Sequence, residues 1–116
     1  MNTEVKKKIL GAVGLASKAR KCITGTELCV EYMRANKGKL LIVAEDVSDN
    51  TGKKLLKTAS FHKIPYITVE LPKAELASSA GKKSDAAAVL FTDEGFVKII
   101  ENLGIEIHTT DTEVLE

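Results

Sequence analysis

Apolar residues recur along this chain with two different periods, and the alternation between them predicts helices separated by strands. In the first segment Val5, Ile9, Val13 and Ala16 fall three or four positions apart, the spacing of one helix face. Residues 40–44 are instead continuously apolar, as expected for a strand covered on both faces. Extended along the chain, these rules predict helices at about residues 4–17, 24–36, 49–62, 72–81 and 93–103, and strands at 22–23, 40–44, 66–69, 86–91 and 105–108.

Polar residues at two of the helix starts supply local signals. Thr24 precedes Glu27 by three positions, which predicts a capping box in which each side chain satisfies a free backbone N–H of the other. Ser48 or Asp49 is placed to cap the third helix. The second helix is expected to end near Asn36. Its inward face is expected to carry Leu28, Cys29, Tyr32 and Met33.

Strands separated by helices indicate one α/β domain. We expect a three-layer α/β/α sandwich around a mixed, mostly parallel central sheet of about four strands. We expect residues 1–116 to form a single domain with its core at about 5–103. Residues 105–108 alternate and predict an edge strand, and residues 109–116 predict an acidic, frayed tail.

Composition indicates the cellular compartment of this domain and the state of its cysteines. A chain of 116 residues with no Trp, three Phe and two Tyr has no apolar run of membrane length and no signal-peptide pattern at its start. Cys22 and Cys29 lie seven positions apart, which fits neither a CxxC pair nor a disulfide framework. We expect reduced thiols, a cytoplasmic monomer, no membrane association and no cofactor.

Charge is divided unevenly along the sequence. Residues 1–39 carry nine Lys or Arg against three Asp or Glu, whereas residues 40–116 carry eight against thirteen. The net charge of +1 conceals this asymmetry. A basic surplus in the first third of the chain favours an anionic partner on one side of the fold.

Candidate catalytic groups form no convincing set. His62 and His108 are far apart, and neither has a second His or a Cys at metal-ligand spacing. Glu45 and Asp46, with Asp49 nearby, follow a predicted strand and could hold Mg²⁺ at its carboxyl end. Capping of the third helix explains the same carboxylates more simply. We therefore expect a protein that is not an enzyme and binds no metal.

Two basic segments favour binding instead. The turn at residues 24–26 presents backbone N–H groups at the positive end of a helix, and Gly25 permits close approach of another backbone. Each cluster alone is equally compatible with a solvated loop, but together with the charge division they favour a nucleic acid. With so few aromatic residues, structured RNA fits better than a base-stacked single strand. The clusters are Lys18, Arg20 and Lys21 before the turn, and Lys82 and Lys83 after the fourth helix.

Three motifs resemble those of the ribosomal protein L7Ae/L30e family. They are Gly25-Thr26-Glu27, the segment KLLIVAEDV at residues 39–47 and the segment TDEGF at residues 92–96. The resemblance covers about residues 5–103 and is strongest to the bacterial YlxQ-like branch, whose members are small and non-enzymatic. It implies an α/β/α sandwich that binds kink-turn RNA, a sharply bent duplex with tandem sheared G·A pairs.

The start of the second helix departs from the family pattern. Tight kink-turn binders usually read Gly-x-Asn-Glu-x-x-Lys there, whereas this chain keeps Gly25 and has Glu27, Leu28 and Glu31 at the other three positions. Two of these exchanges, at Glu27 and Glu31, make the surface more negative, which weakens contacts to phosphates. An alternative follows, a protein-interaction module that kept the fold and lost high-affinity kink-turn binding.

The leading hypothesis is a non-catalytic, ribosome-associated protein that binds kink-turn-like structured RNA, with ribosomal RNA as one candidate and ribosomal or other proteins as further partners. The resemblance implies that Gly25 and the helix start accept the bent backbone, that Glu27 contacts a base edge and that lysines neutralise phosphates. The loop at residues 82–86 would pack beside an extruded nucleotide. The expected RNA-binding residues are Lys18, Arg20, Lys21, Gly25, Thr26, Glu27, Lys37, Lys73, Lys82 and Lys83.

Overall fold

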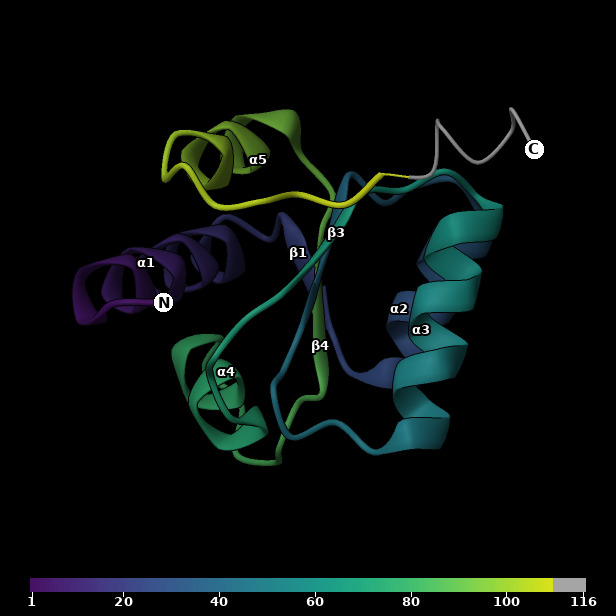
Figure 1. Cartoon of the computed structure of the whole chain (residues 1–116), viewed down its shortest axis with the longest axis horizontal. Helices are drawn as coiled ribbons and strands as arrows, with labels where there is room; N and C mark the ends of the chain where they lie inside the picture. Colours follow the sequence, from purple (N-terminus) through teal and green to yellow (C-terminus); the bar gives the residue numbers. More distant parts are fainter. Residues whose placement is uncertain (110–116) are drawn as a thin grey trace.

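The helices and strands alternate in the order that the hydrophobic pattern predicts. A computed structural model describes residues 1–109 of the chain (Figure 1). The five predicted helices and the first four predicted strands are confirmed, with ends shifted by a few residues. The elements are α1 (Thr3–Lys18), β1 (Cys22–Thr24), α2 (Thr26–Arg34), β2 (Leu40–Val43), α3 (Asp49–Phe61), β3 (Tyr66–Thr68), α4 (Lys73–Ser79), β4 (Ala88–Phe91) and α5 (Glu94–Glu101).

The central sheet has four strands in the order β1-β4-β2-β3. Only the β2–β3 pair is parallel; β4 runs antiparallel to both of its neighbours. The sheet is mixed, as predicted, but the expectation of a mostly parallel sheet is wrong. The reason lies in α4, which is seven residues long and does not return the chain along the sheet. As a result β4 begins where β2 ends, with Ala88 opposite Val43.

Helices cover both faces of this sheet, which confirms the three-layer α/β/α sandwich. Figure 1 shows α1, α4 and α5 on one side and α2 and α3 on the other. The first side closes over Ile42, Val89 and Phe91, and the second over Leu41 and Leu90. All residues of β2 and β4 are buried, as their unbroken apolar sequence predicts.

Helix ends follow the capping signals in the sequence. The Ser48 hydroxyl accepts a hydrogen bond from the Thr51 N–H and so caps α3. Asp93 caps α5 in the same way. α2 ends where Asn36 takes a left-handed conformation with φ of 58°. Asparagine tolerates this conformation better than most residues, which explains why the helix stops near the predicted position.

The predicted strand at residues 105–108 is reduced to a single bridge between His108 and Tyr66. Ile105 and Ile107 pack on the core, so the alternation is genuine even though the extended pairing is absent. The rings of Tyr66 and His108 stack with centroids 5.1 Å apart. The expected acidic tail lies mostly at 110–116, outside the described residues.

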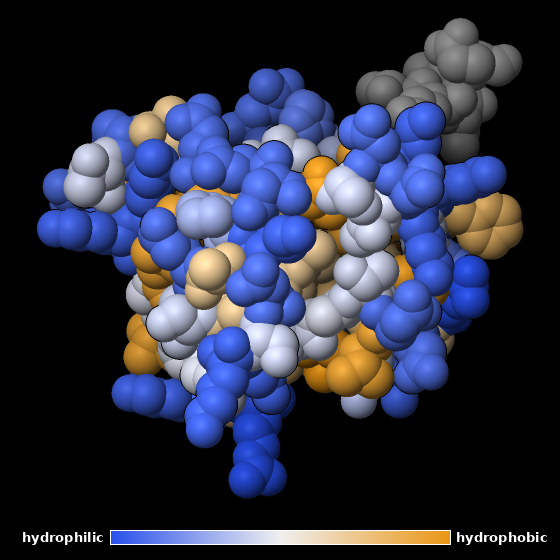
Figure 2. Space-filling view, turned by 90° about the horizontal axis from the view of Figure 1, so that it is seen from below, coloured by the Kyte–Doolittle hydropathy of each residue, from blue (hydrophilic) through white to orange (hydrophobic). Residues whose placement is uncertain are grey.

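The end of the molecule that carries α4 is largely hydrophilic. Figure 2 looks onto this end and shows hydrophilic side chains projecting from it, with apolar surface confined to separate patches. Within the described part of the chain, no helix combines the length and apolarity needed to cross a membrane.

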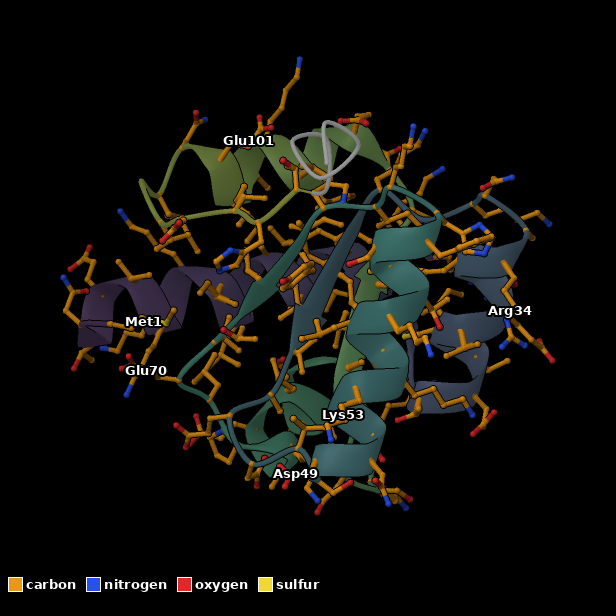
Figure 3. All side chains as sticks on the ribbon, turned by 45° about the vertical axis from the view of Figure 1, so that its right-hand side comes forward. Met1, Arg34, Asp49, Lys53, Glu70 and Glu101 are labelled. Atoms are coloured by element: carbon orange, nitrogen blue, oxygen red, sulfur yellow. The ribbon has the colours of Figure 1, made fainter. Side chains whose placement is uncertain are left out.

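The start of α1 is tied to the segment that follows β3. The ammonium group of Met1 lies 2.8 Å from a carboxylate oxygen of Glu70 (Figure 3). This hydrogen bond and the positive charge hold the pKa of the Glu70 carboxyl below its ordinary value. Glu70 is exposed, so the pair positions the chain more than it stabilises the fold.

Candidate nucleic-acid interface

Gly25 joins β1 to α2 in a conformation that only glycine adopts easily. Its φ and ψ are 98° and 146°, and its N–H donates to the Ala88 carbonyl at 3.0 Å. Thr24 belongs to β1 and pairs with Val89, so its backbone is already committed to the sheet. The predicted capping box between Thr24 and Glu27 is therefore wrong. Gly25 is the N-cap, and no side chain caps the helix.

The first turn of α2 consequently begins with unused backbone donors. No described residue accepts a hydrogen bond from the N–H groups of Thr26, Glu27 or Leu28. These groups lie at the positive end of the helix dipole, where an anion is favoured by about 0.3–1 kcal/mol at an exposed site. The beginning of α2 is thus suited to a phosphate oxygen.

Two adjoining hollows flank this helix start. Both are lined by Thr24, Leu28 and Lys82, and their volumes are about 500 and 320 Å³. Arg20 lines the larger one, and Gly25 the smaller one. The remaining lining residues are Ser17, Cys22, Ile23 and Tyr32 on the first side, and Lys83, Ser84, Asp85 and Ala86 on the second. The loop that follows α4 therefore lies beside the start of α2.

Leu28 separates the two hollows, and its side chain is 50% exposed. The expectation that it lies on the inward face of α2 is wrong. Val30 is buried in its place, together with Cys29 and Met33. Successive helix residues differ in direction by about 100°, so a rotation of the buried face by less than one position is enough to exchange Leu28 for Val30. An exposed apolar side chain thus lies beside the basic residues that line the two hollows.

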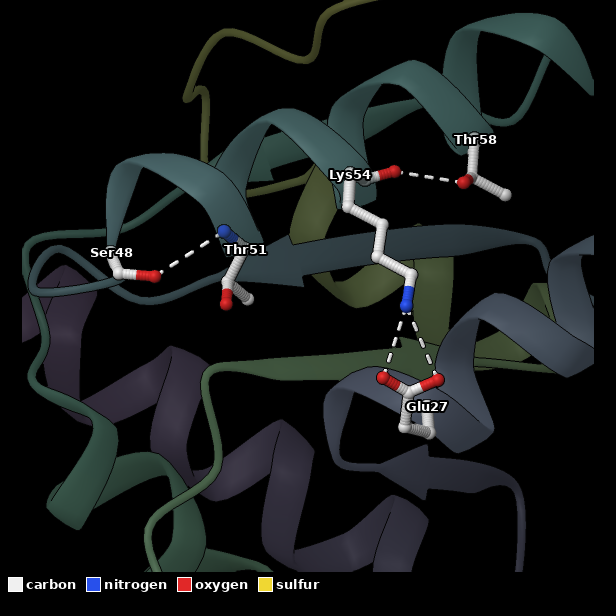
Figure 4. Close-up of polar contacts among 5 residues, drawn as sticks. All are labelled: Glu27, Ser48, Thr51, Lys54 and Thr58. Atoms are coloured by element: carbon white, nitrogen blue, oxygen red, sulfur yellow. Dashed lines mark hydrogen bonds and ion pairs between the residues drawn. The ribbon is translucent and has the colours of Figure 1, made fainter.

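Glu27 is paired with Lys54 of α3. The Lys54 ammonium lies 3.0 and 3.3 Å from the two carboxylate oxygens (Figure 4). The negative charge that replaces the family's Asn at this position is therefore balanced by a cation from the neighbouring helix. Sequence reasoning missed Lys54. In the sequence, Lys54 is only one of several lysines on the outward face of the third helix, a pattern that a solvated surface explains equally well.

Glu31, the second of these exchanges, lines neither hollow at the helix start. It lines a further depression with Tyr32, Ala35 and Lys37, and Tyr32 also borders the larger hollow. The Lys37 ammonium lies 5.7 Å from the centre of the Tyr32 ring. Lys37 therefore belongs to the far end of α2 and does not join the surface around Gly25.

Of the other predicted basic residues, only some lie at the two hollows. Lys21 faces Asp93, with 3.9 Å between ammonium and carboxylate. Lys73 begins α4, and its backbone joins Asp46 and Ala86. Lys18 is exposed near the end of α1 and, like Lys21 and Lys73, lines neither hollow. The predicted residues that the fold gathers at the hollows are Arg20, Gly25, Lys82 and Lys83, with Thr26 and Glu27 adjoining on α2.

Of the three carboxylates after β2, only that of Asp46 accepts a hydrogen bond from another described residue. An oxygen of Asp46 accepts a hydrogen bond from the first N–H of α4 at 2.9 Å, so it caps the fourth helix rather than the third. Asp49 lies in the first turn of α3, which Ser48 caps. Within residues 1–109, no three His, Cys, Asp or Glu side chains are grouped to hold a metal ion. Nothing in this arrangement supports the magnesium alternative for Glu45, Asp46 and Asp49.

Both cysteines are free thiols. Burial raises the pKa of Cys22, with a smaller opposing effect from the nearby charge of Lys82. Burial also raises the pKa of Cys29, to about 12. Because a thiolate is the reactive form, neither side chain is suited to nucleophilic chemistry near neutral pH.

Known proteins resemble this chain over most of its length. The RNA-binding protein YlxQ of Bacillus subtilis is 37% identical over 91 residues, which are 78% of this chain and 89% of that protein. The protein of the same name from Enterococcus faecium is 34% identical over 103 residues, or 89% and 97% of the two chains. A solved structure of a Bacillus halodurans protein of unknown function superposes with a TM-score of 0.73 at 30% identity, covering 81% of this chain and 93% of that one. The sequence profile of the ribosomal protein L7Ae/L30e/S12e/Gadd45 family matches residues 7–101, and the chain belongs to this family.

Proposed function

We propose that this protein binds structured RNA of the kink-turn type through the surface around Gly25 and Leu28. One observation carries the proposal. Free amides at the start of α2 adjoin two hollows into which basic side chains from separate loops converge. Two of the relatives are named RNA-binding proteins, which supports an RNA partner. The chain is not an enzyme, because its family is non-catalytic.

Each part of the surface suits one feature of a bent duplex. The open amides of Thr26 and Glu27 would receive a phosphate oxygen, and the absence of a side chain at Gly25 lets the sugar-phosphate backbone approach. Lys82 and Arg20 would neutralise neighbouring phosphates. Leu28 would contact the face of an extruded base, since it presents apolar surface between the two hollows.

The pairing of Glu27 with Lys54 bears on the departure from the family pattern. A lone carboxylate would repel phosphates, but the paired one presents acceptor oxygens with its charge largely offset. Carboxylate oxygens accept hydrogen bonds from the amino and imino groups on guanine edges. In the proposed complex, Glu27 therefore performs with Lys54 the task that the family assigns to Asn.

The family's description as ribosomal proteins supports a place beside the ribosome in the cytoplasm, which forms part of this proposal. We further propose that the chain acts as a monomer, since one copy contains the whole surface. Recovery of the protein with ribosomal particles from lysed cells, and its loss from them on treatment with ribonuclease, is the expected behaviour.

The direct test is titration of a kink-turn RNA beside the same RNA without its G·A pairs, at two salt concentrations. We expect tighter binding of the intact kink-turn at both. Replacing Lys82 and Lys83 by Ala removes about 1 kcal/mol per phosphate contact, so affinity should fall about 10- to 30-fold. The matched control replaces Lys6 and Lys7 by Ala in the first half of α1, and should bind almost as the parent does.

Equal affinity for the two RNAs would end the kink-turn proposal. The exposed Leu28 then favours the second candidate, a protein-interaction module, because an exposed apolar side chain also suits a protein partner. That candidate requires the protein to bind no cellular RNA even at low salt. An RNA-rich complex recovered with the protein would exclude it.

A further inference from the structure

A third hollow lies at the opposite end of α2, between its last turn and the last turn of α3. Its volume is about 580 Å³, and none of its lining residues is acidic. Arg34, Lys57, Thr58, Phe61 and His62 form it. None of these belongs to the surface around Gly25 and Leu28. Since α2 has nine residues, its two ends lie about 13 Å apart.

Phe61 is the most exposed large apolar side chain of the described residues, with 82% of its surface accessible. Its ring meets the ring of His62 edge-on, with centroids 5.0 Å apart and planes at 80°. This contact orients Phe61 while most of the ring remains open to solvent. Leu15, which is 58% exposed on α1, lines none of the four hollows described. Exposure alone therefore does not distinguish Phe61; its place in a basic hollow does.

The charges around Phe61 are unpaired within residues 1–109. Neither Arg34 nor Lys57 has an ion-pair partner there, whereas Lys54, one turn earlier on α3, is held by Glu27. Figure 3 shows Arg34 on the outer side of α2, extending away from the sheet. An open aromatic ring between two available cations matches the two parts of a nucleotide, a flat base and a phosphate.

We propose that this hollow binds a nucleotide of a single-stranded RNA segment. The base stacks on Phe61, and Arg34 and Lys57 contact the adjoining phosphates. This inference extends the proposed function, since a strand leaving an RNA bound at the start of α2 could follow the α2–α3 surface to the hollow. Loss of a base–aromatic stack in other single-strand sites weakens binding about 5- to 150-fold.

The test is an NMR titration of the full chain with a short single-stranded oligoadenylate. We expect the ring signals of Phe61 and His62 to shift and saturate. Phe61→Ala should weaken binding about fivefold or more, and Leu15→Ala should leave it unchanged. Both side chains are exposed, so both variants should keep the amide spectrum of the folded chain. Inorganic polyphosphate should bind the parent and Phe61→Ala equally, because it has no base to stack.

Equal binding of oligoadenylate to the parent and to Phe61→Ala would overturn the proposal. So would shifts confined to the amides at the start of α2. Shifts produced by an acidic peptide but not by oligoadenylate would assign the hollow to a protein partner instead.

Because oligoadenylate forms no kink-turn, this experiment is separate from the test of the proposed function. Oligoadenylate binding at Phe61 without kink-turn binding would retain this inference and refute the proposed function. If kink-turn binding is observed and neither Phe61→Ala nor a single-stranded extension of the RNA changes it, the proposed function is retained and this inference is refuted.

Discussion

The ion pair between Glu27 and Lys54 offers the sharpest test of how this surface binds RNA. The proposal holds that Lys54 offsets a carboxylate that would otherwise face phosphates. Lys54→Ala exposes that carboxylate, and Glu27→Gln in the same chain removes its charge again. Affinity for a kink-turn RNA should therefore fall in the single variant and recover in the double variant.

The size of the effect follows from the geometry. Both side chains are largely exposed, at 80% for Glu27 and 44% for Lys54, so the pair contributes only about 0.2–1 kcal/mol to folding. A carboxylate about 8 Å from a phosphate experiences about 0.5–2 kcal/mol of repulsion at dielectric constants of roughly 80 to 20. Lys54→Ala should accordingly weaken RNA binding about 2- to 30-fold while barely changing stability.

The matched control is Lys53→Ala. Lys53 is exposed on the same turn of α3, near its start (Figure 3), and makes no ion pair within residues 1–109. It reports the loss of one positive charge without release of Glu27. Fluorescence anisotropy of a labelled kink-turn RNA gives the four affinities, and thermal unfolding confirms that the variants fold. If Lys54→Ala behaves as Lys53→Ala does, and Glu27→Gln restores nothing, the charge-balancing role is refuted.

Three further predictions concern the folded chain itself. Gly25→Ala should lower the free energy of unfolding, measured in denaturant, by about 1–3 kcal/mol. The cause would be backbone strain alone, since no atom lies within 4 Å of the added methyl group. Gly11→Ala, inside α1 and equally unobstructed, should instead stabilise the chain by about 0.5–1 kcal/mol. At about pH 8, a thiol reagent should leave Cys29 unmodified until the chain unfolds, because its pKa of about 12 keeps the thiol protonated. Cys22 should react slowly in the folded chain. Rapid labelling of Cys29 in the folded chain would contradict its burial. Asp46→Ala should lower stability by about 0.5–2 kcal/mol through loss of the hydrogen bond that caps α4. Asp46→Asn keeps an oxygen acceptor and should retain most of the parent's stability. Equal losses in the two variants would mean that the charge of Asp46, not its hydrogen bond, stabilises the helix start.

The layers of the fold were predictable because the signals that define them are local. The unbroken apolar run of β2, the hydroxyl of Ser48 and the left-handed Asn36 each act within a few residues of the chain. Strand direction was not predictable in this way. It depends on whether α4 carries the chain back along the sheet, and the placement of that helix depends on contacts with α1 and β4 from distant parts of the sequence.

The candidate site was predictable only where backbone geometry governs it. Gly25 and the basic loop at residues 82–83 were identified from turn chemistry and charge. The partner of Glu27 was not, because Lys54 is 27 residues away and meets Glu27 only once α2 and α3 pack side by side. The same packing brings Arg34 to Phe61, so the third hollow also has no local signature.

The uneven charge of the sequence does not become a uniformly basic face, and this limits how the surface can recognise RNA. Folding places Asp85 in the smaller hollow and pairs Lys21 with Asp93. What remains at the start of α2 is a few cations beside oriented amides. Counterion release from about two or three phosphate contacts predicts that log K falls against log salt with a slope of about −2 to −3. A slope beyond about −5 would require a footprint much wider than the two hollows, whereas the shallow slope would mean that placement of the amides, Leu28 and Glu27 decides which RNA is bound.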